Sequence, residues 1–140
     1  MGEVLAGAGV LSWLVALSVF DIRDRRLPNW LTLPGAVVIV VAAVFAGRGL
    51  PAVAGGAALF AAYLVVHVLA PSALGAGDVK LAIGVGALTG VFGVDVWVLA
   101  AFAAPLLTAV IALLGNARSP VAHGPSMCAA TLASVGLVVL

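Results

Sequence analysis

The feature that most constrains this chain is a series of long apolar stretches in which charged residues are almost absent. The first stretch covers residues 4–20 and ends at Asp21. Backbone N–H and C=O groups find no water inside hydrocarbon, so a chain crosses a bilayer only as helices or as a closed barrel. These stretches are rich in Ala, Leu and Val and lack the apolar-polar alternation of strands. They therefore predict transmembrane helices.

Composition leaves no room for a soluble domain beside these helices. Hydrophobic residues make up 65% of the 140 positions and charged residues 8%, whereas a soluble domain is about one quarter charged. A bilayer core of about 30 Å takes about 20 helical residues to cross. We expect one all-α, polytopic membrane domain over residues 1–140, with Pro105 kinking its fifth helix. The six expected helices cover 4–20, 31–47, 51–70, 78–92, 95–114, and the residues that follow a last polar loop at 115–125.

Several functional classes are excluded by the same counts. The net charge is +1 and no Lys/Arg run is long enough to follow phosphates, so no nucleic-acid partner is expected. Cys128 is the single cysteine and offers no disulfide or paired thiol ligands, so we expect it to pack inside a helix. We expect neither a metal nor a cofactor. The first apolar stretch has no basic segment before it and is interpreted as a retained helix.

The basic residues predict how the helices are oriented. With six crossings, five of the six basic residues fall at one end of the bundle, and only Arg48 falls at the other. Loops rich in Lys and Arg stay in the cytoplasm, so this end is predicted to be cytoplasmic and both termini to lie outside. The five residues are Arg23, Arg25, Arg26, Lys80 and Arg118.

Three of the five acids lie at the same end: Asp21, Asp24 and Asp78. A carboxylate at the edge of hydrocarbon is costly because water no longer solvates its charge, so such residues are functional candidates. Two carboxylates that share a water cannot both ionise easily, so one keeps a proton while the other acts as general base. We expect packing to bring Asp21 and Asp78 within a few Å, close enough for a disulfide between cysteines placed there.

The residues around Asp78 have two interpretations each. Gly75 and Gly77 either permit a turn that presents Asp78 and lets another segment approach, or simply connect two helices. Lys80 either favours the ionised form of Asp78 or extends to the interface. Gly86 continues a stripe of small residues on the fourth helix, which we expect to hold Asp78 near the first helix.

The residues around Asp21 also have more than one interpretation. Pro28 and Asn29 are expected to fix the loop after the first helix, with Asn29 capping the second. Asp24 is expected to pair with Arg25 or Arg26 at the headgroup level. His123 lies in the last polar loop with no partner that the sequence indicates.

Taken together, these residues resemble the type IV prepilin peptidase family. The resemblance implies an all-α, GxGD-type membrane aspartic protease with Asp21 and Asp78 as catalytic residues and Gly75, Gly77, Lys80, Pro28 and Asn29 in support. It also implies a prepilin or pilin-like substrate whose short basic leader is removed at the cytoplasmic face of a prokaryotic plasma membrane. The implied enzyme is surrounded by membrane lipid and requires no cofactor. The motif reads Asp21-x-Arg23-x-x-x-Leu27-Pro28-Asn29-x-Leu31-Thr32, then Gly75-x-Gly77-Asp78-x-Lys80-Leu81, then Gly86 and Gly90.

Larger members of that family carry an N-terminal segment with paired cysteines and also methylate the new N-terminus. This chain shows neither the segment nor the cysteines, so it is similar to the short form of Tad/Flp-type pilus systems, and no methyl transfer is expected.

Three other interpretations compete with this one. A small proton-coupled transporter or channel would also contain acids, but near the bilayer midplane rather than at helix ends. A non-catalytic assembly factor would not need both aspartates. Proteases of the presenilin or signal-peptide-peptidase type share Gly-x-Gly-Asp but lack the Leu27-Pro28-Asn29 motif.

Overall fold

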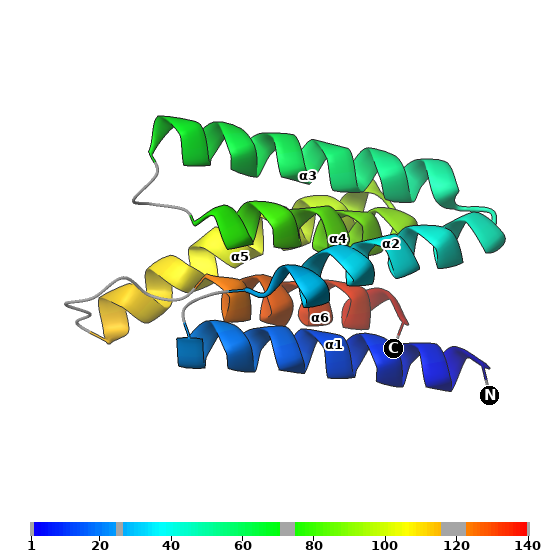
Figure 1. The fold of residues 1–140 in the computed structure, drawn as a ribbon, viewed down its shortest axis with the longest axis horizontal. Helices are drawn as coiled ribbons and strands as arrows, with labels where there is room; N and C mark the ends of the chain where they lie inside the picture. Colours follow the sequence, from blue (N-terminus) through cyan, green and yellow to red (C-terminus); the bar gives the residue numbers. More distant parts are fainter. Residues whose placement is uncertain (1, 25–26, 71–74, 116–122, 140) are drawn as a thin grey trace.

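A computed structural model describes residues 2–24, 27–70, 75–115 and 123–139 and contains no strand within them. The all-α prediction is confirmed, with six helices that run back and forth along one direction (Figure 1). Their bounds are α1 Gly2–Asp24, α2 Asn29–Phe45, α3 Gly49–Leu69, α4 Ala76–Phe92, α5 Val94–Leu114 and α6 Gly124–Val139.

The dimensions and surface of the bundle fit a lipid bilayer. Three helices are long and apolar enough to span one by length and composition: Val4–Asp24, Gly49–Leu69 and Val94–Leu114. The helices α2 and α4 have 17 residues each, or about 26 Å at the usual rise per residue, close to the hydrocarbon thickness. Large apolar side chains are exposed along α1, α2, α3, α5 and α6. A surface this apolar would be unstable in water, and it identifies a polytopic membrane protein.

Most helix boundaries differ from the predicted ones by one or two residues, and the end of α1 differs by four. The first helix does not end before Asp21 but continues to Asp24, because at the edge of hydrocarbon a further helical turn keeps backbone C=O groups hydrogen-bonded. The last helix begins at Gly124 and includes Pro125, which the first turn of a helix accepts because no N–H is required there. The α5 helix is continuous through Pro105.

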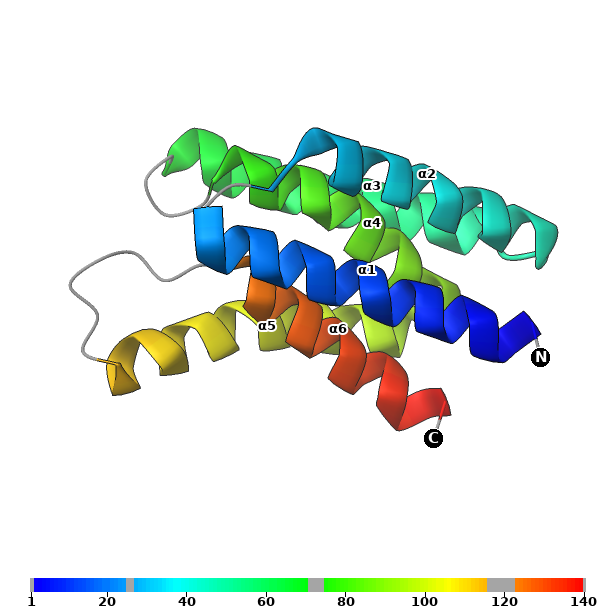
Figure 2. The same cartoon turned by 60° about the horizontal axis from the view of Figure 1, so that its bottom comes forward.

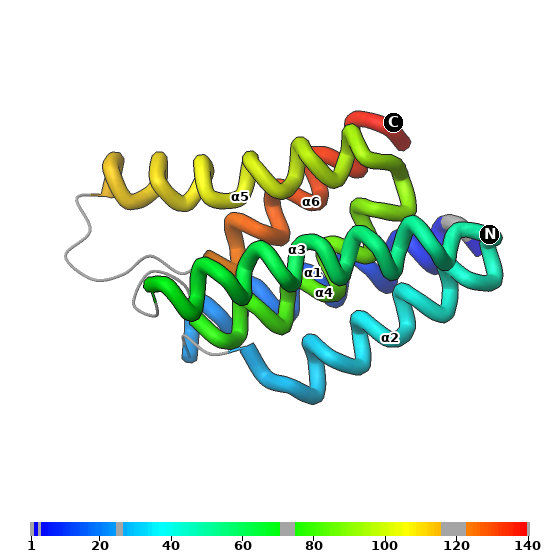
Figure 3. The backbone as a smooth tube through the Cα atoms, turned by 90° about the horizontal axis from the view of Figure 1, so that it is seen from above, coloured from blue at the N-terminus to red at the C-terminus, as the bar shows by residue number. Residues whose placement is uncertain are grey.

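The α4 helix lies at the centre of the bundle and packs against α2, α3, α5 and α6 (Figures 2 and 3). Its buried stretch is unusually rich in glycine. A Cβ on Gly86 would lie 2.5 Å from the carbonyl oxygen of Gly55, so the stripe of small residues brings α4 against α3 rather than against α1. Gly84 instead faces Trp13 of α1, whose ring N–H donates to the carbonyl oxygen of Leu31 at 2.8 Å.

The start of α1 and the end of α6 lie at one end of the bundle, and the ends of α1, α3 and α5 lie at the other with the starts of α2, α4 and α6 (Figure 1). The helix ends that carry Arg23 and Lys80 are at the second end, whereas Arg48 precedes α3 at the first. This arrangement matches the predicted separation of basic residues where the chain is described. Arg25, Arg26 and Arg118 fall outside the described residues.

Candidate active site

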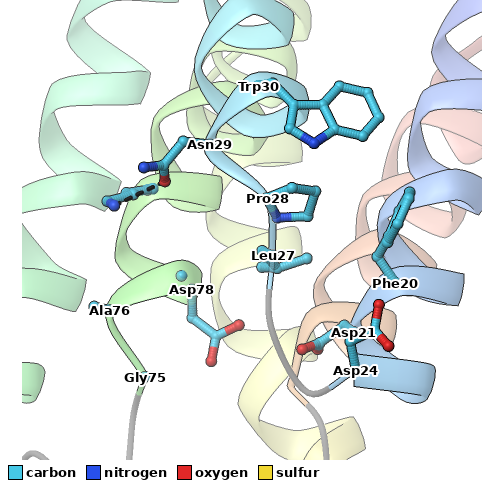
Figure 4. Close-up of a pocket in the computed structure, with 12 residues that line it drawn as sticks. Phe20, Asp21, Asp24, Leu27, Pro28, Asn29, Trp30, Gly75, Ala76 and Asp78 are labelled. Carbon is cyan, nitrogen blue, oxygen red and sulfur yellow. Dashed lines mark hydrogen bonds between the residues drawn. The ribbon is translucent and has the colours of Figure 1, made fainter.

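A cavity of about 710 Å³ opens at the end of the bundle opposite the termini, between the ends of α1, α2 and α4 (Figure 4). Every residue that the resemblance implies as catalytic or supporting lines this one cavity, as does Asp24. The complete lining is Phe20, Asp21, Asp24, Leu27, Pro28, Asn29, Trp30, Gly75, Ala76, Gly77, Asp78 and Lys80.

Asp21 is the more buried of the two central acids, with 7% of its surface exposed. It lies in the last two turns of α1, and the backbone N–H of Gly124 donates to its Oδ2 at 2.7 Å. A hydrogen bond from a backbone N–H to a carboxylate is among the stronger protein hydrogen bonds. The donor comes from the first residue of α6, more than a hundred positions along the chain.

Asp78 lies in the first turn of α4 and is half-buried. Its own backbone N–H donates to the carbonyl oxygen of Gly75 at 3.1 Å, which closes the turn that begins the helix. The positive end of the helix dipole favours a negative charge at this position. A negative charge on Asp21 repels a negative charge on Asp78 across the cavity.

The backbones that carry these two acids are farther apart than the sequence led us to expect. Within the described residues, no Cα atom of α1 lies within 8 Å of a Cα atom of α4. A disulfide needs Cα atoms no more than about 7 Å apart, so the expectation that cysteines at 21 and 78 would form one is wrong. The physical reason is that the backbone of α4 packs against α2 and α6 rather than against α1. The space between the carboxylates is the cavity itself.

The two glycines before Asp78 have different roles. Gly75 has φ −76° and ψ 155°, an extended conformation that any residue adopts, and a Cβ there would meet Oδ2 of Asp78 only at an ordinary 3.8 Å. Gly77 lies inside α4, and a Cβ there would lie 3.2 Å from Cβ of Leu27. Of the two, Gly77 is the one that admits a neighbouring segment.

Asn29 does not cap the second helix, so this part of the prediction is wrong. The capping position is Pro28, and this helix start has no side-chain capping hydrogen bond. The amide oxygen of Asn29 instead accepts a hydrogen bond from Nζ of Lys80 at 2.8 Å. This bond joins the starts of α2 and α4 on one side of the cavity, and it is drawn in Figure 4.

The outer part of the cavity is more exposed. Asp24 is exposed on the last turn of α1, and its expected partners Arg25 and Arg26 lie outside the described residues. The rings of Phe20 and Trp30 meet edge to face with centroids 5.8 Å apart, which places an aromatic pair on the rim between α1 and α2.

A polar cluster around His123 was not predicted from the sequence. His123, which precedes α6 outside the membrane-spanning helices, lies with Nε2 2.9 Å from the hydroxyl of Tyr63 and with Nδ1 2.7 Å from the hydroxyl of Thr108. Burial lowers the pKa of His123 to about 4. A neutral imidazole has one donor and one acceptor nitrogen, and hydroxyl groups can match either.

Two further observations concern alternative chemistry at the site. Among the described residues, no group of three or more His, Cys, Asp or Glu side chains is arranged to hold a metal ion. Cys128 is a buried free cysteine in α6, as predicted.

Residues 8–114 match the type IV leader peptidase family. The chain belongs to this family. Its members are peptidases, so the resemblance inferred from the motif is confirmed, and a leader-peptidase type of function follows in general. The match includes the entire cavity lining but ends before His123 and Gly124. No curated protein and no solved structure matches the chain.

Proposed function

We propose that this protein is a membrane aspartic endopeptidase that removes the short basic leader from prepilins or pilin-like proteins at the cytoplasmic face of a prokaryotic plasma membrane. The observation that carries the proposal is that Asp21 and Asp78, from helices far apart in sequence, line one cavity at the end of the bundle where the described basic residues Arg23 and Lys80 also lie.

Paired carboxylates are sufficient for peptide hydrolysis without a metal or a covalent nucleophile. The ionised aspartate removes a proton from water, which attacks the scissile carbonyl carbon, while the protonated aspartate donates a hydrogen bond to the developing oxyanion. Collapse of the tetrahedral intermediate breaks the C–N bond, and the leaving amine takes the proton that the first aspartate removed from water. The separation of α1 and α4 leaves space for both the water and the peptide between the two carboxylates.

The position of the acids favours hydrolysis over transport. Asp21 is the fourth residue from the end of α1, and Asp78 is the third residue of α4. Both therefore lie where the hydrocarbon ends, and a substrate whose own helix lies in the bilayer presents its leader junction at that depth. A proton-coupled transporter would place acids near the midplane.

The proposal is tested by co-expression with a tagged Flp-type prepilin, with loss of the leader read by electrophoresis and by mass spectrometry of the new N-terminus. We expect the wild type to process the prepilin and Asp21→Asn or Asp78→Asn to abolish processing, because Asn keeps the size of Asp but cannot exchange a proton. Asp24→Asn is the matched control, since Asp24 is exposed.

Full processing by either dyad variant would reject the aspartic mechanism. Absence of processing by the wild type with several prepilins, combined with a proton flux in reconstituted vesicles that Asp78→Asn removes, would favour the transporter interpretation instead.

A further inference from the structure

We propose that the start of α6 is a positioning device for Asp21: the N–H of Gly124 fixes its carboxylate, and His123 fixes Gly124 by binding α3 and α5. This inference rests on the proposed function and adds residues that lie outside the segment matching the family.

The contact between Gly124 and Asp21 requires glycine. The N–H of Gly124 donates to Oδ2 of Asp21 at 2.7 Å, and Gly124 is buried. A Cβ on Gly124 would collide with Oδ2 and would lie 2.9 Å from Cγ of the same side chain. Both atoms belong to the carboxyl group itself, so any other residue at this position would displace the catalytic group.

His123 anchors the start of α6 through both its side chain and its backbone. Its ring bonds Tyr63 of α3 through Nε2 and Thr108 of α5 through Nδ1, at 2.9 and 2.7 Å. Its carbonyl oxygen accepts the N–H of Met127 at 3.0 Å, which is the first hydrogen bond of the α6 helix. With both ring nitrogens bonded, the imidazole has one orientation, and the backbone that follows is held with it.

The consequence concerns orientation rather than chemistry. Three helices fix His123, and the next residue directs an N–H at a buried carboxylate oxygen. A catalytic carboxylate must face the attacking water within a narrow range, and a misplacement of about 1 Å can cost on the order of 100-fold in rate. Gly124 and His123 therefore act through Asp21 and touch neither the water nor the substrate.

The first test compares two Gly→Ala changes in the same helix. Gly124→Ala should lower kcat for prepilin cleavage on the order of 100-fold with KM nearly unchanged, whereas Gly136→Ala should match the wild type because a Cβ there meets nothing within 4 Å. Both purified variants should be folded, as read by thermal unfolding in detergent. A folded Gly124→Ala with wild-type kcat, or with only KM raised, would overturn the inference.

If Gly124→Ala does not fold, a second pair of variants decides. Thr108→Val keeps the shape of the side chain but removes the hydroxyl that bonds His123, and kcat should fall by up to about tenfold, the value of one hydrogen bond. Thr108→Ser restores the hydroxyl and should restore kcat. Equal kcat for the Val and Ser variants would reject the positioning role. Wild-type protein and Asp21→Asn are measured alongside. A wild type that does not cleave prepilin contradicts the proposed function. A wild type that cleaves prepilin, with an unchanged kcat in the Gly124 and Thr108 variants, contradicts only this inference.

Discussion

Asp21 and Lys80 each form a hydrogen bond to a residue of another helix. The sequence motif includes one of these two partners but not the other. Lys80 bonds Asn29, which belongs to the same motif. Asp21 bonds the backbone of Gly124, and no side-chain pattern marks that donor. The motif therefore predicted which residues gather at the cavity, but it could not predict the groups that orient Asp21.

The glycines before Asp78 give a prediction about single residues. Gly77→Ala should lower cleavage activity, because its Cβ would press against Leu27 and move the segment that lines the cavity. Gly75→Ala is the matched control and should retain activity, because Gly75 has an ordinary backbone conformation and its Cβ would make only an ordinary van der Waals contact. Initial rates of prepilin cleavage by equal amounts of folded enzyme measure the difference. Equal loss in both variants would mean that the glycines act through loop flexibility instead.

His123 gives a prediction about pH. Burial lowers its pKa from 6.5 to about 4, so between these values the unfolded chain binds a proton that the folded protein does not. The contribution of the neutral His123 to the free energy of unfolding is fully present above about pH 6.5 and is lost as pH falls towards about 4. Thermal unfolding in detergent should show the wild type losing stability relative to His123→Gln across this window. A constant difference between the two proteins would contradict the burial of a neutral imidazole.

At the scale of elements, the packing of α4 explains why its pattern of small residues predicted close contact between helices. Its glycines let α3 approach until backbone touches backbone, and Trp97 of α5 donates its ring N–H to the carbonyl of Gly55 at 2.9 Å in the same region. The helix that carries Asp78 in its first turn is thus the most buried element of the described bundle. Close packing of small residues is a usual basis of helix association in lipid.

This packing predicts a difference between two glycines. Gly86→Ala should destabilise the protein by about 1–3 kcal/mol, because its Cβ would lie 2.5 Å from the Gly55 carbonyl oxygen and 2.9 Å from Cβ of Leu59. Gly136→Ala, which has open space, should be neutral or slightly stabilising. Unfolding by a denaturing detergent, followed by circular dichroism, compares them. A neutral Gly86→Ala would show that α3 and α4 separate at little cost.

At the scale of the whole molecule, the number and type of helices followed from the apolar stretches, since most of them are about as long as a hydrocarbon crossing requires and none alternates like a strand. Helix ends were less predictable: a carboxylate such as Asp21 was expected to end α1, but a helix continues into the interface wherever its backbone gains from hydrogen bonds. The cluster of Tyr63, Thr108 and His123 was unpredictable because it depends on how three separate helices pack.

The arrangement of the helices also predicts which end of the bundle faces the cytoplasm. Single cysteines are placed in a Cys128→Ser background: Trp30→Cys at the cavity end and Leu50→Cys at the opposite end, both at exposed positions. Arg23 and Lys80 lie at the cavity end, and basic residues flanking helices remain cytoplasmic. In inverted membrane vesicles, where the cytoplasmic face is outside, an impermeant thiol reagent should label Trp30→Cys and not Leu50→Cys, with the reverse in right-side-out spheroplasts. Labelling of both from one side would mean that the helices do not cross as a six-span bundle, and the opposite pattern would place the cavity outside the cell, away from the leader of an uncleaved prepilin.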